Sequence, residues 1–371
     1  MADYVYKRKN PYDPFDNPTE NCAYRTDYRD IDPEIDTPDY EPPLLPARRE
    51  RKNIRRYFNA AGMGLLLGAV FVNIVFVLLV SLLEFCMTGS IDYSDMLDAE
   101  SYIYYDSSIL IAMNGLLFLV ANTVPSVIGC RATGIRLRSL FRPLDTKKGE
   151  LVRYMFIGIF IQAITGILYA LVSTIMEAGG IQDYAPEIDS FVNVKATVAT
   201  GLYTCLIAPV TEELLYRGFV LKNLSRVSQH FGIIVSAVLF GLAHENIAQF
   251  LLALPTGIFM ARLVVKHNSL IPSILVHMAV NTMAFFMEMI FYFTPESMGV
   301  LLFLLDVVYY VVAAAGLVFW ILEVRKTRLP ANTIRQSYRG VRIALTTPWL
   351  MAAVLFHLGM TIVGIVSQNS Y

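Results

Sequence analysis

A series of long apolar segments, each nearly free of charged residues, constrains the fold of this chain more than any other feature. The nine segments cover residues 59–86, 108–128, 152–175, 194–221, 231–247, 249–266, 270–293, 299–322 and 345–367. A helix needs about 20 apolar residues to cross the hydrocarbon core of a bilayer, and it satisfies its backbone hydrogen bonds internally. Only 16% of the 371 residues are charged, against about a quarter in soluble domains. The sequence therefore predicts an all-α, polytopic transmembrane helix bundle of about nine spans, or of eight.

The connectors between these segments alternate in charge, which predicts how the chain lies in the membrane. Basic residues cluster in 48–56, 131–148 and 325–342, with further basic residues after the fourth and sixth segments. The other connectors are acidic and contain no basic residue until Lys195. Because the cytoplasmic connectors of membrane proteins carry the excess of Lys and Arg, we predict a cytoplasmic N-terminus and an external C-terminus.

The first 56 residues differ in composition from the rest of the chain. They are rich in Tyr, Asp and Pro, contain no apolar run and end in the first basic cluster. We predict a disordered cytoplasmic tail over 1–56, which is not a signal peptide, and a transmembrane bundle over 57–371. The net charge of −1 gives no indication of a nucleic-acid partner. The four cysteines show neither disulfide nor metal spacing.

Polar side chains inside three apolar segments are candidates for function, because ionisable groups within a membrane are costly and usually face a cavity or a partner. With one aromatic neighbour, the set is Glu212, Glu213, Arg217, Phe240, His244, His277 and Asn281. Glu213 and Arg217 are four residues apart, so they meet on one helix face and can neutralise each other. Glu212 is rotated by about 100° around the helix from Glu213, so its side chain can face away from this pair. Phe240 lies one turn before His244 and can pack against its ring.

The depths of these side chains in the membrane agree. At 1.5 Å per residue, Glu212 lies roughly 15 Å from the cytoplasmic end of its helix, His277 roughly 12 Å and His244 roughly 20 Å. Three helices that are not consecutive thus carry polar groups in the inner half of the membrane. We predict that these groups converge on one site. Asn122 and His357, in other segments, are expected to form hydrogen bonds between helices.

This set of side chains is suited to hydrolysis. A carboxylate near an imidazole in a walled cavity can hold a water molecule and take its proton. A second imidazole beside an amide can donate hydrogen bonds to a developing oxyanion. The same Glu and His side chains could instead bind Zn²⁺ and leave a position open for water. His244 and Glu245 do not begin an HExxH zinc motif, because residue 248 is Ala.

The motifs EExxxR, FxxxH and HxxxN, in this order on membrane helices, resemble those of the CPBP intramembrane protease family. This family includes CAAX prenyl endopeptidases and bacteriocin-processing and Abi-type proteins. The resemblance covers about 194–293, roughly a quarter of the chain. It implies that Glu212 activates water with help from His244, and that His277 and Asn281 form the oxyanion hole. Glu213, Arg217 and Phe240 would give structural support.

The resemblance also implies a substrate and bears on the cofactor. The expected substrate is a membrane-embedded or lipidated peptide, cut near the cytoplasmic leaflet. We favour a mechanism without a metal, because Asn281 stands where a zinc site would need a third strong ligand. Zinc is the alternative, with Glu212, His244 and His277 as ligands. The expected location is a bacterial inner membrane.

Two other functions remain open at this point. A proton-coupled transporter would use Glu212, His244, His277 and the lone Asp306 of the eighth segment as a relay. A relay needs groups spread across the bilayer, whereas the three motif groups share one depth, which favours a reaction centre. The other reading is a catalytically silent immunity or scaffold protein, against which the complete motif set speaks.

Overall fold

The computed structural model describes residues 46–89, 107–183, 190–226, 228–324 and 340–369. Throughout these ranges the regular elements are helices, so the predicted all-α class is confirmed. Residues 1–45 of the predicted tail lie outside the described residues. The basic run that follows them belongs to the first described helix.

The helices follow one another without any intervening strand in the described ranges. They are α2 (Pro46–Thr88), α3 (Ser107–Ala132), η4 (Leu137–Phe141), α4 (Lys148–Ala178), α5 (Val194–Leu202), η5 (Tyr203–Ile207), α6 (Ala208–Glu212), η6 (Glu213–Val220), α7 (Leu221–Leu224), α8 (Gln229–Leu242), α9 (Ile247–His267), α10 (Ile271–Phe293), η7 (Glu296–Met298), α11 (Gly299–Val324), α12 (Gly340–Leu345) and α13 (Pro348–Gln368). The elements from α5 to α7 form one continuous helix over Val194–Leu224.

Eight helices in the described part of the chain are long and apolar enough to cross a membrane. The protein is therefore an integral, multi-pass membrane protein. The exception among the nine predicted segments is the fifth, which forms α8, a helix of 14 residues and about 21 Å. That is less than the hydrocarbon thickness of about 30 Å. Helix α8 packs against α9, and its polar C-terminal turn is partly buried.

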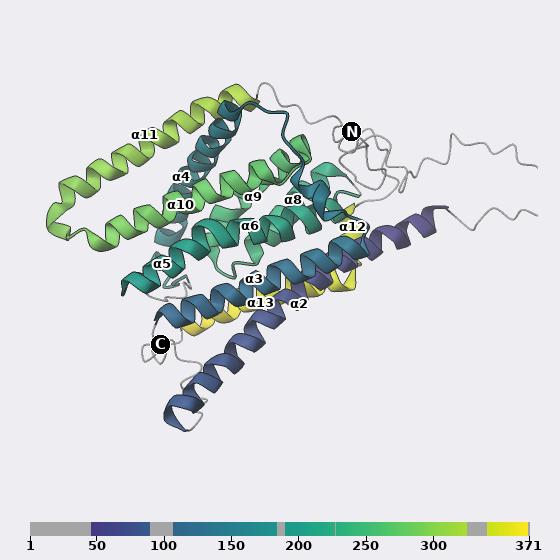
Figure 1. The fold of residues 1–371 in the computed structure, drawn as a ribbon, viewed down its shortest axis with the longest axis horizontal. Helices are drawn as coiled ribbons and strands as arrows, with labels where there is room; N and C mark the ends of the chain where they lie inside the picture. Colours follow the sequence, from purple (N-terminus) through teal and green to yellow (C-terminus); the bar gives the residue numbers. More distant parts are fainter. Residues whose placement is uncertain (1–45, 90–106, 184–189, 227, 325–339, 370–371) are drawn as a thin grey trace, which may run out of the picture.

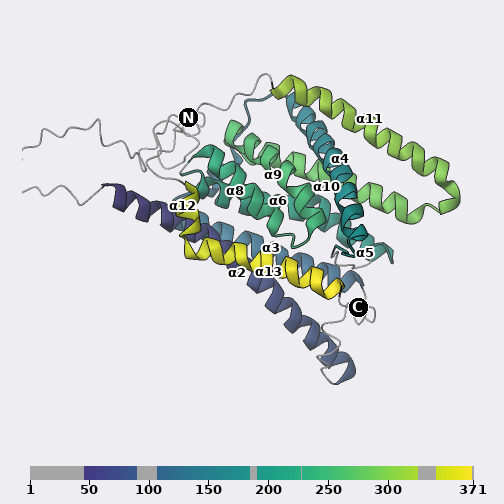
Figure 2. The same ribbon diagram turned by 180° about the vertical axis from the view of Figure 1, so that it is seen from behind.

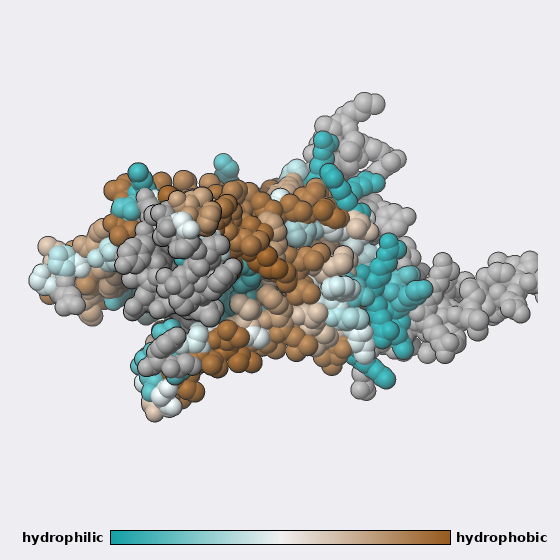
Figure 3. Space-filling model, turned by 90° about the horizontal axis from the view of Figure 1, so that it is seen from below, coloured by the Kyte–Doolittle hydropathy of each residue, from teal (hydrophilic) through white to brown (hydrophobic). Residues whose placement is uncertain are grey.

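The bundle has a polar centre between two apolar edges. Figures 1 and 2 show α11 along one edge and α2 along the opposite edge, with the helices from α5 to α10 between them. Large apolar side chains of both edge helices are exposed, for example Leu78 at 61% and Val300 at 76%. Figure 3 shows a broad hydrophobic region across the middle of one face, with hydrophilic residues toward its ends. This distribution suits a protein surrounded by lipid.

The first and the last long helices of the described chain are in intimate contact. A Cβ atom on Gly62 of α2 would lie 2.3 Å from backbone atoms of Leu350 in α13. Only glycine lets the two backbones approach so closely. Helix α13 is thereby fixed against the bundle, where it also contacts α8.

Candidate active site

The 194–224 helix, which carries both glutamates, is not a regular α-helix. It contains two π-helical segments, η5 over Tyr203–Ile207 and η6 over Glu213–Val220. Such i→i+5 segments are rare and frequently mark functional sites. Residue spacing alone predicts a regular helix over this segment and gives no sign of the two π-helical segments.

Pro209 determines which carbonyl of the first irregular segment lacks a backbone donor. In η5 the N–H of Ala208 donates to the carbonyl of Tyr203, five residues back. The next donor in this register would be residue 209, but proline has no N–H. The carbonyl of Thr204 therefore lacks that donor, and the side-chain amide of Asn281 donates to it at 3.0 Å. A second N–H of the same amide stays available for another acceptor.

The predicted pair of Glu213 and Arg217 is present and fully buried. Arg217 Nη1 lies 2.9 Å from Glu213 Oε1, and both side chains have 0% exposure. The guanidinium carbon of Arg217 lies 4.1 Å from the ring centre of Phe240. The arginine thus has a carboxylate on one side and an aromatic face on the other. Phe240 contacts both the arginine and the imidazoles, as described next.

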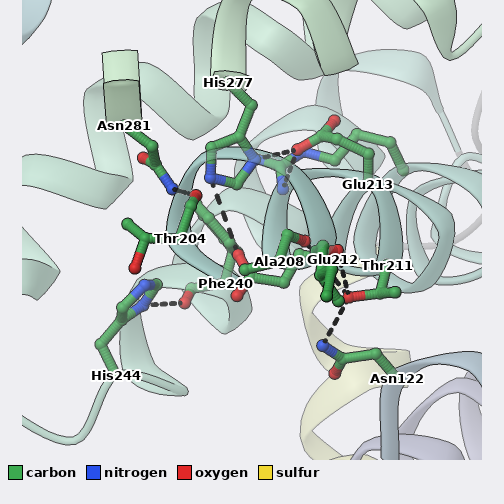
Figure 4. Close-up of polar contacts among 12 residues, drawn as sticks. Asn122, Thr204, Ala208, Thr211, Glu212, Glu213, Phe240, His244, His277 and Asn281 are labelled. Carbon is green, nitrogen blue, oxygen red and sulfur yellow. Dashed lines mark hydrogen bonds and ion pairs between the residues drawn. The ribbon is translucent and has the colours of Figure 1, made fainter. Parts of the chain in front are cut away.

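His277 on α10 lies between the two glutamates (Figure 4). Its Nδ1 is 3.1 Å from Glu213 Oε1, and its Nε2 is 3.7 Å from Glu212 Oε2. The first is a hydrogen-bond distance, whereas the second exceeds one. Glu213 is buried and engaged, while the side chain of Glu212 is 18% exposed. The two neighbouring carboxylates therefore have different environments, and Glu212 is the accessible one.

His244 follows the last turn of α8 and is oriented by Phe240. Its Nδ1 lies 2.9 Å from the carbonyl oxygen of Phe240, and the two rings are perpendicular at 5.0 Å. A neutral imidazole that donates from Nδ1 has an unprotonated Nε2, which can accept a proton. The ring of Phe240 is also 5.7 Å from that of His277, so Phe240 separates and packs both imidazoles.

The predicted residues are brought together to different degrees. Direct contacts connect five of them, namely Glu212, Glu213, Arg217, Phe240 and His277. His244 joins the group through Phe240, and Asn281 joins it through Thr204 (Figure 4). Sequence reasoning missed Thr204, although Pro209 in an apolar segment was a signal for an irregular helix nearby.

A hydrogen bond also connects the helical turn that carries Glu212 to α3. The side-chain amide of Asn122 donates to Thr211 Oγ1 at 3.3 Å, and both residues are buried. Because Thr211 directly precedes Glu212, this bond restrains the helix at the candidate base. The expected interhelical role of Asn122 is confirmed.

The donor set offers only part of a metal site. Glu212 and His277 lie close enough to share an ion, but among the residues that the structure describes no group of three or more His, Cys, Asp or Glu side chains is arranged to hold one. The alternative zinc set of Glu212, His244 and His277 is not assembled in this arrangement.

Comparison with known families bears directly on this site. The family model described as type II CAAX prenyl endopeptidase Rce1-like matches residues 194–283. These residues form a CPBP-family domain. The domain runs from α5 into α10 and contains all seven of the residues predicted from the sequence. Neither the curated proteins nor the solved structures gave a match. At the level of the family, the CPBP domain supports an intramembrane endopeptidase.

Proposed function

We propose that this protein hydrolyses a peptide bond of a membrane-embedded or lipidated substrate, with Glu212 as the general base. The observation that carries this proposal is the asymmetry between the two glutamates. Glu213 already contacts both Arg217 and His277. Glu212 is accessible, and its carboxylate lies 3.7 Å from His277. Glu213 therefore has a structural role, and Glu212 is available as the general base.

The proposed reaction begins with a water molecule held by Glu212 and His244. Glu212 takes a proton from the water while the oxygen attacks the carbonyl carbon of the scissile bond. The carbonyl oxygen becomes an oxyanion, which His277 and the second N–H of Asn281 stabilise. A His277 protonated on both nitrogens donates to Glu213 and to the oxyanion at once. Collapse of the intermediate breaks the C–N bond, and Glu212 returns its proton to the leaving amine.

The proposed setting is a bacterial inner membrane with the N-terminus in the cytoplasm. The alternation of basic and acidic connectors supports this orientation. The site would then open toward the cytoplasmic leaflet, where a lipidated peptide can present its scissile bond. The bilayer itself confines such a substrate to the membrane plane in which the enzyme lies.

Peptide cleavage by the purified full-length protein in detergent tests the proposal. We expect Glu212→Gln to lower kcat by about 10²- to 10⁴-fold, because a positioned base contributes that much. His244→Ala should also lower kcat. Glu288→Gln, which alters a carboxylate elsewhere on α10, is the matched control and should cleave at the wild-type rate. Wild-type cleavage by both site variants would sink the assignment.

The same assay addresses the cofactor and the substrate. We expect cleavage to survive chelation, and zinc add-back to change nothing. Loss on chelation with recovery on zinc would instead support the alternative ligands Glu212, His244 and His277. Comparing a lipidated peptide with its unmodified form measures how much the lipid contributes to kcat/KM.

A further inference from the structure

The turn between α8 and α9, residues 243–246, presents His244 and has an unusual backbone. Glu245 adopts φ 58°, in the left-handed region. A residue with a Cβ atom pays a steric cost there, so it persists only where surrounding contacts hold it. Two of the contacts that hold this turn come from parts of the chain outside the CPBP domain.

The first contact comes from α13. Nδ1 of His357 donates to Glu245 Oε1 at 2.9 Å, and the imidazole side chain is only 5% exposed. The hydrogen bond expected for His357 is thus present, and its partner is the residue next to His244. More than a hundred residues separate the two in sequence.

The second contact comes from the segment that follows α4. The carboxylate of Asp183 accepts from the backbone N–H groups of Ile247 at 3.2 Å and Ala248 at 2.8 Å. These are donors at the start of α9 that the helix itself cannot satisfy. Asp183 therefore fixes the far side of the turn.

Helix α13 also holds the Asp183 segment. The side-chain amide of Asn369 accepts from the backbone N–H of Gln182 at 2.8 Å and donates to its carbonyl at 2.9 Å. The end of α13 thus supports Asp183, while its middle supports Glu245. Within the turn, Asn246 donates to the His244 carbonyl at 2.8 Å. These contacts together leave the turn little freedom to move.

We propose that α13 is a positioning element for the active site, which acts through the His357–Glu245 contact and the Asn369–Gln182 contact to hold His244. This inference rests on the proposed function for its catalytic consequence. His357 and Glu245 do not touch the reacting atoms. They set the direction in which His244 presents Nε2, and a displacement of about 1 Å at a catalytic group can cost a hundredfold in rate.

The test compares Glu245→Ala with Glu245→Gln in the full-length protein. Gln keeps an oxygen that accepts from His357, and both substitutions keep a Cβ atom at the left-handed position. We expect Glu245→Ala to lower kcat by about ten- to a hundredfold with KM unchanged, and Glu245→Gln to restore most of it. Thr361→Val on α13 is the control, because that hydroxyl donates only to the α13 backbone at His357.

A measurement independent of activity keeps the test decisive. The chain has five histidines, so a ring-carbon (¹³Cε1) NMR spectrum is simple, and His244→Ala identifies the His244 signal. That signal should shift or broaden in Glu245→Ala and stay in place in Glu245→Gln. If Glu245→Ala fails to fold, Asn369→Ala serves in its place. It removes the Asn369–Gln182 contact and should move the His244 signal in the same way.

Failure of this inference is distinguishable from failure of the proposed function. A wild-type protein that cuts no peptide contradicts the protease, yet the NMR comparison still tests whether α13 positions His244. A wild-type kcat together with an unmoved His244 signal in Glu245→Ala and Asn369→Ala would overturn the role of α13.

Discussion

His277 and His244 belong to one candidate site but are held by different kinds of support. The ion-pair layer, which comprises Glu213, Arg217 and His277, is buried and contains two side chains with no exposure. The outer turn, residues 243–248, is held by hydrogen bonds of Glu245 to His357 and of the start of α9 to Asp183, and the Glu245 side chain is 24% exposed. One imidazole therefore depends on buried charge and the other on several weaker contacts.

This difference predicts how each region fails. Removing one member of a buried ion pair leaves an uncompensated charge, which costs far more than the net value of the pair. Removing one contact of the outer turn leaves the others in place. The ion-pair layer should therefore control folding, and the outer turn should control the geometry of catalysis.

The largest effect is expected for Arg217→Met. It leaves the buried Glu213 carboxylate without its arginine, with His277 as its remaining contact, which should lower the free energy of unfolding by about 3–5 kcal/mol. Denaturation in mixed detergent micelles measures this loss. The double variant Glu213→Gln/Arg217→Met removes both charges and should recover much of the stability. A single variant as stable as wild type would contradict the importance of the ion-pair layer.

Asn281→Ala should affect both catalysis and stability. Loss of an oxyanion donor lowers kcat by about 10²- to 10³-fold, and the unpaired Thr204 carbonyl costs about 1–3 kcal/mol. Adding Pro209→Ala supplies a backbone N–H that can bond Thr204. The double variant should recover stability but not kcat. Recovery of both would show that Asn281 serves the helix alone.

A smaller effect is expected for Asp183→Ala, which removes the acceptor of two backbone N–H groups at the start of α9. The loss in unfolding free energy should be about 1 kcal/mol. Because Asp183 and Glu245 restrain one turn, their Ala variants should couple by at least about 0.5 kcal/mol in a double-mutant cycle. The Asn122→Ala variant, on the other side of the site, should be additive with Glu245→Ala. Additivity of Asp183 and Glu245 would break the description of the outer turn as one unit.

The smallest effect is expected for Asp306→Asn on α11. This residue lies outside both regions, so cleavage should stay within about twofold of wild type, as for surface changes. A transporter relay would instead need its carboxylate. Solute-driven proton uptake in vesicles that disappears in Asp306→Asn, without peptide cleavage by wild type, would favour that alternative.

The sequence predicted the parts of this structure that depend on local spacing. Apolar length identified the helices, and four-residue spacing identified the Glu213–Arg217 contact. Depth arithmetic correctly brought His277 near Glu212. These features follow from helix geometry, which the order of residues determines directly.

Other features could not be read from local spacing. Helix α8 ends early, at a turn whose left-handed Glu245 is paired with His357 from α13. In η5, Pro209 cannot donate to the Thr204 carbonyl, and Asn281 on α10 supplies the donor in its place. In each case a distant side chain decides the local backbone, and one sequence gives no direct sign of such pairs.

The place of α13 along the chain has a consequence for biosynthesis. A ribosome makes the helices of the CPBP domain before α13, which begins 55 residues after the end of α10 (348 − 293). On the proposed role of α13, the nascent chain holds Glu212, His277 and Asn281 in the membrane well before His244 is locked in place. On that role, activity would reach its full level only after this late helix has been inserted, because the contacts of Glu245 and Gln182 with α13 form last.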